Sequence, residues 1–122
     1  MDVLGIDHVG LHVTDVERSL AFYVDLFGFE QLPRPDLGFP GAWLRIGRSQ
    51  ELHLIGRNSS PQVPPEERHW SIQVRGLASW HARLAHAGLA LRGPKSRPDG
   101  AQQLFVRDPD GHVLELLERL AV

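Results

Sequence analysis

The stretch Asp108-Pro109-Asp110-Gly111-His112-Val113-Leu114-Glu115-Leu116-Leu117-Glu118 determines how the rest of the chain is interpreted. Its first half has the chemistry of a tight turn, because proline presets φ and aspartate and glycine suit the neighbouring positions. Its second half is a short apolar run, typical of a buried strand. Glu115 interrupts that run, and a carboxylate among leucines is costly to bury unless it is paired or bound to a cation. The simpler alternative is an edge strand whose Glu115 faces solvent.

The first half of the chain predicts a strand, a helix and three further strands. Alternation over residues 6–13 gives an apolar face and an opposite face that carries His8, Gly10 and His12. Thr14-Asp15-Val16-Glu17 has the form of a capping box, and apolar residues then recur at helical spacing up to Phe27, before Gly28. The elements expected next are a short strand at 29–32, a proline-containing loop at 33–41 and two strands at 42–46 and 51–55.

The same series of elements is expected again after a linker at 57–68 that is rich in proline and serine. The second series comprises a strand at 69–74, a helix at 77–87 closed by Gly88, a short strand at 89–91, a glycine- and proline-rich loop at 92–100, a strand at 102–107 and the opening stretch at 108–118. We therefore expect an α+β fold of two tandem βαβββ modules, 5–56 and 68–118, within one domain that spans residues 1–122.

Each module carries one candidate ligand on its first strand and one on its last. The separation of His8 from His53 matches that of His69 from Glu115 to within one residue, and each candidate lies opposite an apolar face. A single histidine is more simply explained as a surface imidazole. Four ligand-type residues at matching places of a repeat instead predict a metal site. Three imidazoles and one carboxylate suit Zn, Ni, Fe or Mn, and ligand type alone does not choose among them.

Composition narrows the classes of function. The chain has 122 residues, 42% of them hydrophobic, a formal net charge of −2 at pH 7 and no cysteine. Disulfides and thiolate sites are excluded, and no basic footprint indicates nucleic acid or an anionic membrane surface. The start at Met1-Asp2 lacks the features of a signal peptide, and no apolar segment approaches the ~20 residues that span a bilayer. We expect a cytoplasmic protein whose partner is a small molecule.

Both ends of the chain resemble the vicinal oxygen chelate superfamily, which includes glyoxalase I, methylmalonyl-CoA epimerase, fosfomycin-modifying transferases, extradiol dioxygenases and bleomycin-binding proteins. The similar residues are His8-Val9-Gly10-Leu11-His12-Val13-Thr14-Asp15, continued by Ser19, Phe22-Tyr23 and Phe27-Gly28-Phe29, and Asp108-Pro109-Asp110-Gly111-His112 ahead of Leu114-Glu115-Leu116. The resemblance runs from about Gly5 to Glu118. It implies paired modules whose mixed sheets curl into a cup around one divalent metal ion, held by His8, His53, His69 and Glu115.

The resemblance implies a metal-dependent lyase or isomerase that acts on a small substrate with two adjacent oxygens. Glu115 is the candidate general base; alternatively it is only a ligand, and His53 or a bound water transfers the proton. Bacterial glyoxalase I enzymes carry a glutamate where this chain has His53, so activity on glutathione adducts is not supported. The alternative functions are an extradiol-type dioxygenase, a related transferase, or a non-catalytic protein that binds a small molecule such as an antibiotic.

The substrate pocket is expected on the ligand-bearing faces, at Gly10, His12, Trp43, Ser71, Gln103 and Phe105. The loop 92–100 carries three cations and either closes over an anionic substrate or is a solvated surface loop. His81 and His86 are expected to face solvent, and His112 to be structural. We also expect a homodimer in which His8 and His53 of one chain meet His69 and Glu115 of the other. The alternative packs both modules of one chain around a single site.

Overall fold

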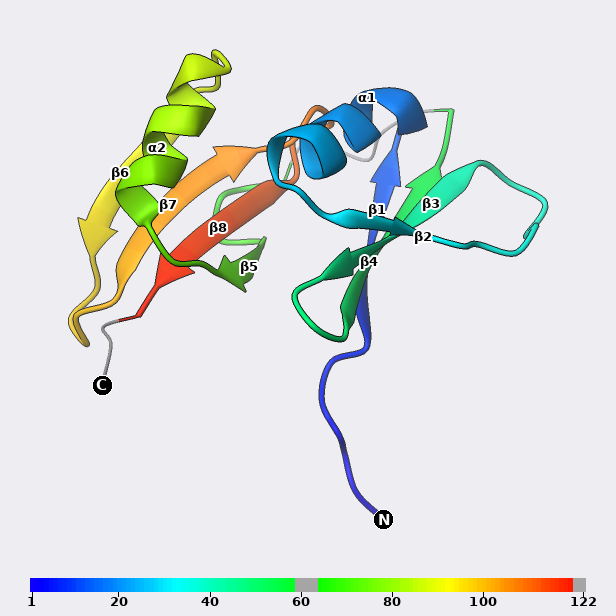
Figure 1. Cartoon of the computed structure of the whole chain (residues 1–122), viewed down its shortest axis with the longest axis horizontal. Helices are drawn as coiled ribbons and strands as arrows, with labels where there is room; N and C mark the ends of the chain where they lie inside the picture. The colour runs from blue at the N-terminus through cyan, green and yellow to red at the C-terminus, as the bar shows by residue number, and fades with distance from the viewer. Residues whose placement is uncertain (59–63, 120–122) are drawn as a thin grey trace. The chain divides into compact units, whose positions relative to one another are not determined.

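Two βαβββ modules make up the computed structural model, which describes residues 1–58 and 64–119 (Figure 1). The first consists of β1 (His8–Val13), α1 (Val16–Leu20), the π-helical η1 (Ala21–Leu26), β2 (Glu30–Leu32), β3 (Gly41–Ile46) and β4 (Gln50–Gly56). The second consists of β5 (His69–Gln73), α2 (Leu77–His86), β6 (Leu91–Ser96), β7 (Gln102–Arg107) and β8 (Val113–Glu118). The predicted α+β class with a repeated βαβββ order is confirmed, while residues 59–63 of the expected linker lie outside the described residues.

Each module forms its own four-stranded sheet with the same strand order. The orders are β1-β4-β3-β2 and β5-β8-β7-β6. In both sheets the first and last strands of the module pair in parallel, whereas the other neighbours are antiparallel. The parallel pairs bring His8 beside the strand of His53, and His69 beside the strand of Glu115. Each pair of predicted ligands therefore shares one sheet face.

The opposite face of each sheet forms a core with the helical segment of its own module. The buried residues of the first core are Leu11, Val13, Leu44, Leu52 and Leu54, with Phe22, Tyr23 and Phe27 from the helical segment. The second core contains Ile72, Leu104, Leu114 and Leu116, with Leu77 and Leu84 from α2. The alternation predicted from the sequence is confirmed, because these apolar residues take one face and the candidate ligands take the other.

The first helix starts one residue later than its predicted capping box. Asp15, not Thr14, is the N-cap, and its carboxylate accepts a 3.1 Å hydrogen bond from the backbone N–H of Arg18. After Leu20 the helix widens, so that the N–H of Phe27 donates to the carbonyl of Phe22. No helix in the described ranges is both long enough and apolar enough to cross a lipid bilayer.

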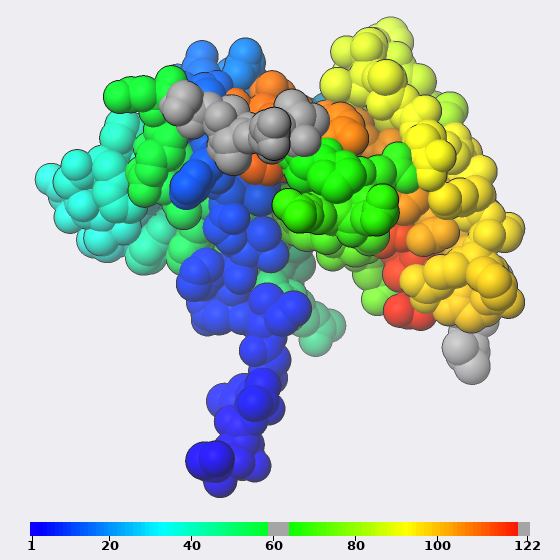
Figure 2. Space-filling view, turned by 180° about the vertical axis from the view of Figure 1, so that it is seen from behind, coloured from blue at the N-terminus to red at the C-terminus, as the bar shows by residue number. Residues whose placement is uncertain are grey.

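The first strand is shorter than predicted. It begins at His8 instead of residue 6, and Ile6 is 74% exposed. The reason is the length of its partner: β4 begins at Gln50, and the N–H of Glu51 pairs with the carbonyl of Asp7. Within the described residues nothing continues β4 alongside the segment 1–6. These residues project from the sheet as an extended arm (Figures 1 and 2).

Two predictions for the segment that contains β6 were wrong, the short strand at 89–91 and the loop at 92–100. A strand runs from Leu91 to Ser96 along the edge of the sheet, and its register against β7 shifts between Arg92 and Lys95. Pro94 lies inside this irregularity, where an edge strand tolerates a residue without an N–H. The sequence was misleading because Gly93-Pro94 ordinarily indicates a loop.

Candidate metal and substrate site

Glu115 lies in an interior strand of the second sheet and is 4% exposed, so the alternative of an exposed edge strand was wrong. Its neighbours in register are Ser71 on β5 and Phe105 on β7. The side-chain amide of Gln103 donates a 2.6 Å hydrogen bond to Oε2. The Nε2 atom of His69 lies 3.3 Å from Oε1. The buried carboxylate is therefore paired at both oxygens, as the cost of burying it requires.

The ring of His69 is oriented by its other nitrogen. Nδ1 lies 3.0 Å from the backbone carbonyl oxygen of Glu66, which can only accept a hydrogen bond, so Nδ1 carries the proton. In a neutral imidazole Nε2 then presents a lone pair to Oε1 of the ionised Glu115, which is also an acceptor. Two facing acceptors are stabilised by a cation between them, either a proton on the ring or a metal ion.

The distance between these two atoms suits a metal ion. Bonds of about 2.0–2.1 Å from zinc to nitrogen and oxygen, at a tetrahedral angle, separate two ligand atoms by about 3.3–3.4 Å. The observed separation of His69 Nε2 from Glu115 Oε1 is 3.3 Å. A metal-binding histidine usually donates its second ring N–H to a carbonyl or carboxylate, as His69 does. The pair therefore fits as two ligands of a metal site.

The histidines of the first module form a stack. The rings of His8 and His53 lie 4.0 Å apart at 15°, and Trp43 stacks on the other side of His53 at 4.5 Å and 11°. Gly10 and Trp43 are the neighbours of His53 in register. A ring nitrogen binds a metal through a lone pair in the ring plane, so two stacked rings cannot both bind one ion. For both to bind, at least one ring must turn out of the stack.

Two carboxylates that the sequence interpretation missed contact these histidines. His53 Nε2 donates to Oε1 of Glu51 at 2.9 Å, and His8 Nδ1 donates to Oδ2 of Asp7 at 2.8 Å. Carboxylates beside metal-binding imidazoles fix their tautomer and orientation. The signal for Glu51 was available, because residues two apart in a strand share a face and Glu51 precedes His53 by two.

The structure thus assembles two predicted pairs, His8 with His53 and His69 with Glu115. In residues 1–58 and 64–119 no group of three or more candidate ligands is gathered. Of the remaining predicted residues, His12 continues the ligand-bearing face of β1 opposite Ile55. His86 is exposed and His81 partly so. The backbone N–H of His112 donates to the Asp108 carboxylate within the turn.

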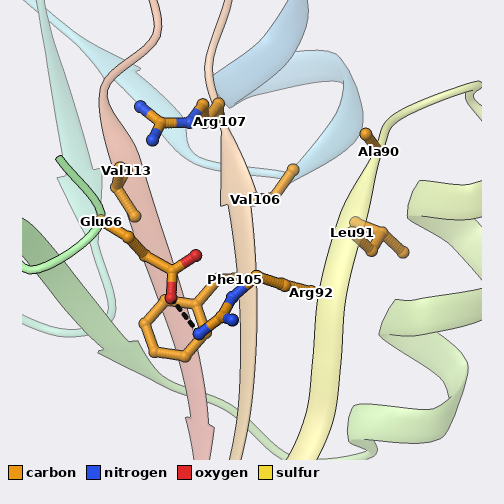
Figure 3. A pocket seen from close by; sticks show the side chains of 8 residues that line it. All are labelled: Glu66, Ala90, Leu91, Arg92, Phe105, Val106, Arg107 and Val113. Carbon is orange, nitrogen blue, oxygen red and sulfur yellow. Dashed lines mark ion pairs between the residues drawn. The ribbon is translucent and has the colours of Figure 1, made fainter. Parts of the chain in front are cut away.

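A hollow of about 490 Å³ adjoins His69 on the second module. Its lining residues are Glu66, Glu67, His69, Arg92, Lys95 and Phe105. The ring of Phe105 meets that of His69 edge-on, with centroids 5.5 Å apart. A neighbouring hollow of about 260 Å³ shares Glu66, Arg92 and Phe105 and is otherwise lined mainly by apolar side chains (Figure 3). Space for a small substrate therefore lies beside the His69–Glu115 pair.

Comparison with known proteins places the chain in a family. Residues 5–116 match the family model of the Glyoxalase/Bleomycin resistance protein/Dioxygenase superfamily. The chain belongs to this superfamily. The resemblance predicted from its two end motifs is confirmed, and the strand order of the two modules is that of a glyoxalase-like fold.

Relatives within the superfamily differ in activity. Glyoxylase I 4 of Arabidopsis thaliana is 29% identical over 95% of this chain and 71% of its own length. Metallothiol transferase FosB of Shouchella clausii is 30% identical, over 98% of this chain and 86% of its own. Two solved structures are each 27% identical to this chain over 98% of its length. The first is a protein of Bacillus anthracis described as glyoxalase family, with a TM-score of 0.85 and 98% of its own chain covered. The second is the antibiotic binding protein TnmS3 of Streptomyces sp. CB03234, with a TM-score of 0.81 and 99% of its own chain covered.

Proposed function

We propose that this chain is a metal-dependent enzyme of the glyoxalase type, which removes a proton next to a carbonyl in a small substrate with two adjacent oxygens. The observation that carries the proposal is the contact between His69 Nε2 and the buried Oε1 of Glu115, two acceptors at the spacing of two metal ligands. The likeness to a glyoxylase and a metallothiol transferase supports the same class.

The proposed site has four ligands, His8, His53, His69 and Glu115, two from each module. Zn, Ni, Fe and Mn all accept this set of nitrogen and oxygen donors. In a homodimer the His8–His53 pair of one chain would complete the His69–Glu115 pair of its partner; in a single-chain cup the two pairs of one chain would join. A bound ion of this kind supplies Lewis acidity, which stabilises negative charge on the substrate oxygens.

Glu115 has the surroundings of a general base. Gln103 holds Oε2, while Oε1 faces His69, so the carboxylate is oriented from both sides. The ring of Phe105 and the buried side chains of Val113 and Leu117 limit access of water to the same sheet face. A carboxylate positioned in this way contributes about 10²–10⁴-fold to proton removal.

Elemental analysis of the purified protein tests the metal site. The expected content is one divalent ion per complete cup, lost in His69→Ala and in Glu115→Ala. His81→Ala is the matched control, because His81 lies on α2 and belongs to neither pair, and it should retain the metal. Undiminished metal content in the His69→Ala protein would contradict the assignment.

Exchange of substrate hydrogen for solvent deuterium tests the reaction. Hemithioacetals, 2-hydroxy ketones and 2-oxo acids form the panel, with thiol-free substrates included because His53 replaces the glutamate of glyoxalase I enzymes. Exchange should require metal and disappear in Glu115→Gln. Oxygen consumption with catechols in place of exchange would favour a dioxygenase, and binding of the panel without turnover would favour a binding protein.

Mixing two inactive chains tests the shared cup. A His8→Ala chain and a Glu115→Ala chain each lack one ligand, but their heterodimer would hold one intact set if the cup is built from two chains. Recovery of metal binding is the expected result. A verified heterodimer that binds no metal would favour the single-chain cup.

A further inference from the structure

Two cations of β6 lie over one aromatic ring. The guanidinium carbon of Arg92 is 5.9 Å from the centroid of Phe105, and the ammonium nitrogen of Lys95 is 5.3 Å from it. In a regular strand, residues three apart point to opposite faces. The register shift changes this, because Arg92 pairs with Phe105 and Lys95 with Gln103, which are two apart on β7. The irregularity therefore aims both cations at the sheet face that carries Glu115.

A carboxylate of the chain itself occupies this place. Glu66, in the segment before β5, forms an ion pair with Arg92, and the two side chains meet in Figure 3. Both also line the hollow that contains Lys95 and His69. The Arg92 side chain is 62% exposed and that of Glu66 is 31% exposed. An ion pair with this much solvent exposure contributes little stability, so another carboxylate can displace that of Glu66 from Arg92.

We propose that Arg92 and Lys95 bind a carboxylate of the substrate, and that Glu66 occupies this subsite until the substrate arrives. The inference rests on the proposed function, because the oxygen pair of the substrate would lie toward His69 and Glu115. Phe105, whose ring centroid lies 5.5 Å from that of His69, stands between the place for the substrate carboxylate and the place for its oxygen pair. Its ring would contact the part of the substrate that joins these two groups. The substrate class is thus a small carboxylic acid with an apolar spacer of a few atoms between the carboxylate and two further adjacent oxygens.

Charge and geometry favour a carboxylate over a neutral group. Glu66 and Glu67 balance Arg92 and Lys95 in the lining of the hollow. When Glu66 swings out, the lining gains a positive charge that an incoming anion neutralises. The planar fork of an arginine also matches a carboxylate with two parallel hydrogen bonds.

Calorimetric titration of the chelator-treated, metal-free protein tests the subsite apart from the metal. The probes are benzoate, benzamide and methylphosphonate. Benzoate should bind and benzamide should not. Arg92→Gln and Lys95→Gln should each weaken benzoate binding about tenfold, which is the scale of one lost charge-assisted hydrogen bond. Arg92→Lys keeps the charge but loses the fork, so its binding of benzoate should be weakened less. All variants should unfold at the same denaturation midpoint as the wild type.

Two glutamates give the matched control for displacement. Glu66→Gln should bind benzoate several-fold more tightly, because it removes the resident competitor. Glu67→Gln removes the same charge from the same hollow and should change the affinity little. Equal gains in the two variants would overturn the displacement, and unchanged affinity in both cation variants would overturn the subsite. Preferred binding of methylphosphonate would overturn the assignment to a carboxylate. The metal content of the Arg92 and Lys95 variants is measured in parallel and should be normal, so that failure here is distinguishable from failure of the metal site.

Discussion

Gln103 donates a 2.6 Å hydrogen bond to Glu115 from the neighbouring strand. The two residues are diagonal in the sheet, because the partner of Glu115 in register is Phe105. The bond holds Oε2, and Oε1 is then the oxygen that faces His69. The orientation of the buried carboxylate thus depends on an amide that is itself no metal ligand.

Replacing this amide should weaken both folding and metal binding. Gln103→Leu leaves a buried carboxylate oxygen without its donor, so we expect the free energy of unfolding of the metal-free protein to fall by about 1–3 kcal/mol. Metal affinity should fall by about 10–100-fold, as for other residues that orient a ligand. Gln102→Leu is the control, since Gln102 bonds to Ser96 at an exposed edge. Equal losses of metal affinity in both variants would contradict the role of Gln103.

Metal binding should change the fluorescence of Trp43. Its indole stacks on His53, which in turn stacks on His8, and this arrangement must open for both imidazoles to bind one ion. In a protein with Trp70→Phe and Trp80→Phe, Trp43 is the remaining tryptophan. Its emission should shift on titration with zinc, and the further change His53→Ala should abolish the response. Constant emission at full metal occupancy would show that the stack persists.

The turn before β8 should depend on Asp108. This residue is 5% exposed, and its Oδ1 accepts 2.9 Å hydrogen bonds from the backbone N–H groups of Asp110 and His112. Asp108→Ala should lower the free energy of unfolding by about 1–3 kcal/mol, measured by urea denaturation, because buried donors lose their acceptor. Asp36→Ala removes a similar 2.9 Å bond to the N–H of Gly38 in an exposed loop and should cost less. A loss no larger than that of Asp36→Ala would contradict the prediction.

Asp99 should titrate well below the ordinary range for a carboxyl group. Hydrogen bonds from the Arg97 guanidinium, and then from the Ala101 N–H, hold the pKa of Asp99 below its usual value. A lowered pKa in the folded state adds stability that is present above the unfolded pKa of about 3.9 and is lost as the pH falls through the folded pKa. A carbon-13 NMR titration checks this. Arg97→Gln should return the pKa of Asp99 toward its usual value, and an unchanged pKa would contradict the cause.

The repeated fold, and the placing of His8 beside His53 and of His69 beside Glu115, could be predicted because they depend on local patterns. His53 between two leucines has only one sheet face available to it once those leucines are buried. The match between the separations of the two pairs then predicted that both modules place their candidate ligands alike. The boundaries of a strand depend instead on the length of its partner strand, which local patterns do not give. The start of β1 was therefore predicted too early.

The contacts among polar side chains could not be predicted in this way. Arg92 and Lys95 share a face only because of an irregularity in the pairing of β6, which the residue types do not specify. The pairing of Glu66 with Arg92 joins segments distant in the chain, and composition indicated only a linker there. The stacking of His8 on His53 depends on side-chain rotamers, which alternation leaves open.

The closure of each sheet within its own module has a consequence during protein synthesis. Every strand partner of the first sheet lies at or before Gly56. At about 5–20 residues per second, the ribosome needs roughly 3–12 seconds to add a second module of comparable length. Helices and hairpins form in microseconds, so the first sheet can close once β4 has left the ribosome, without waiting for the second sheet to be completed. His8 and His53 would then be brought together before β8 pairs with β5 and places Glu115 beside His69.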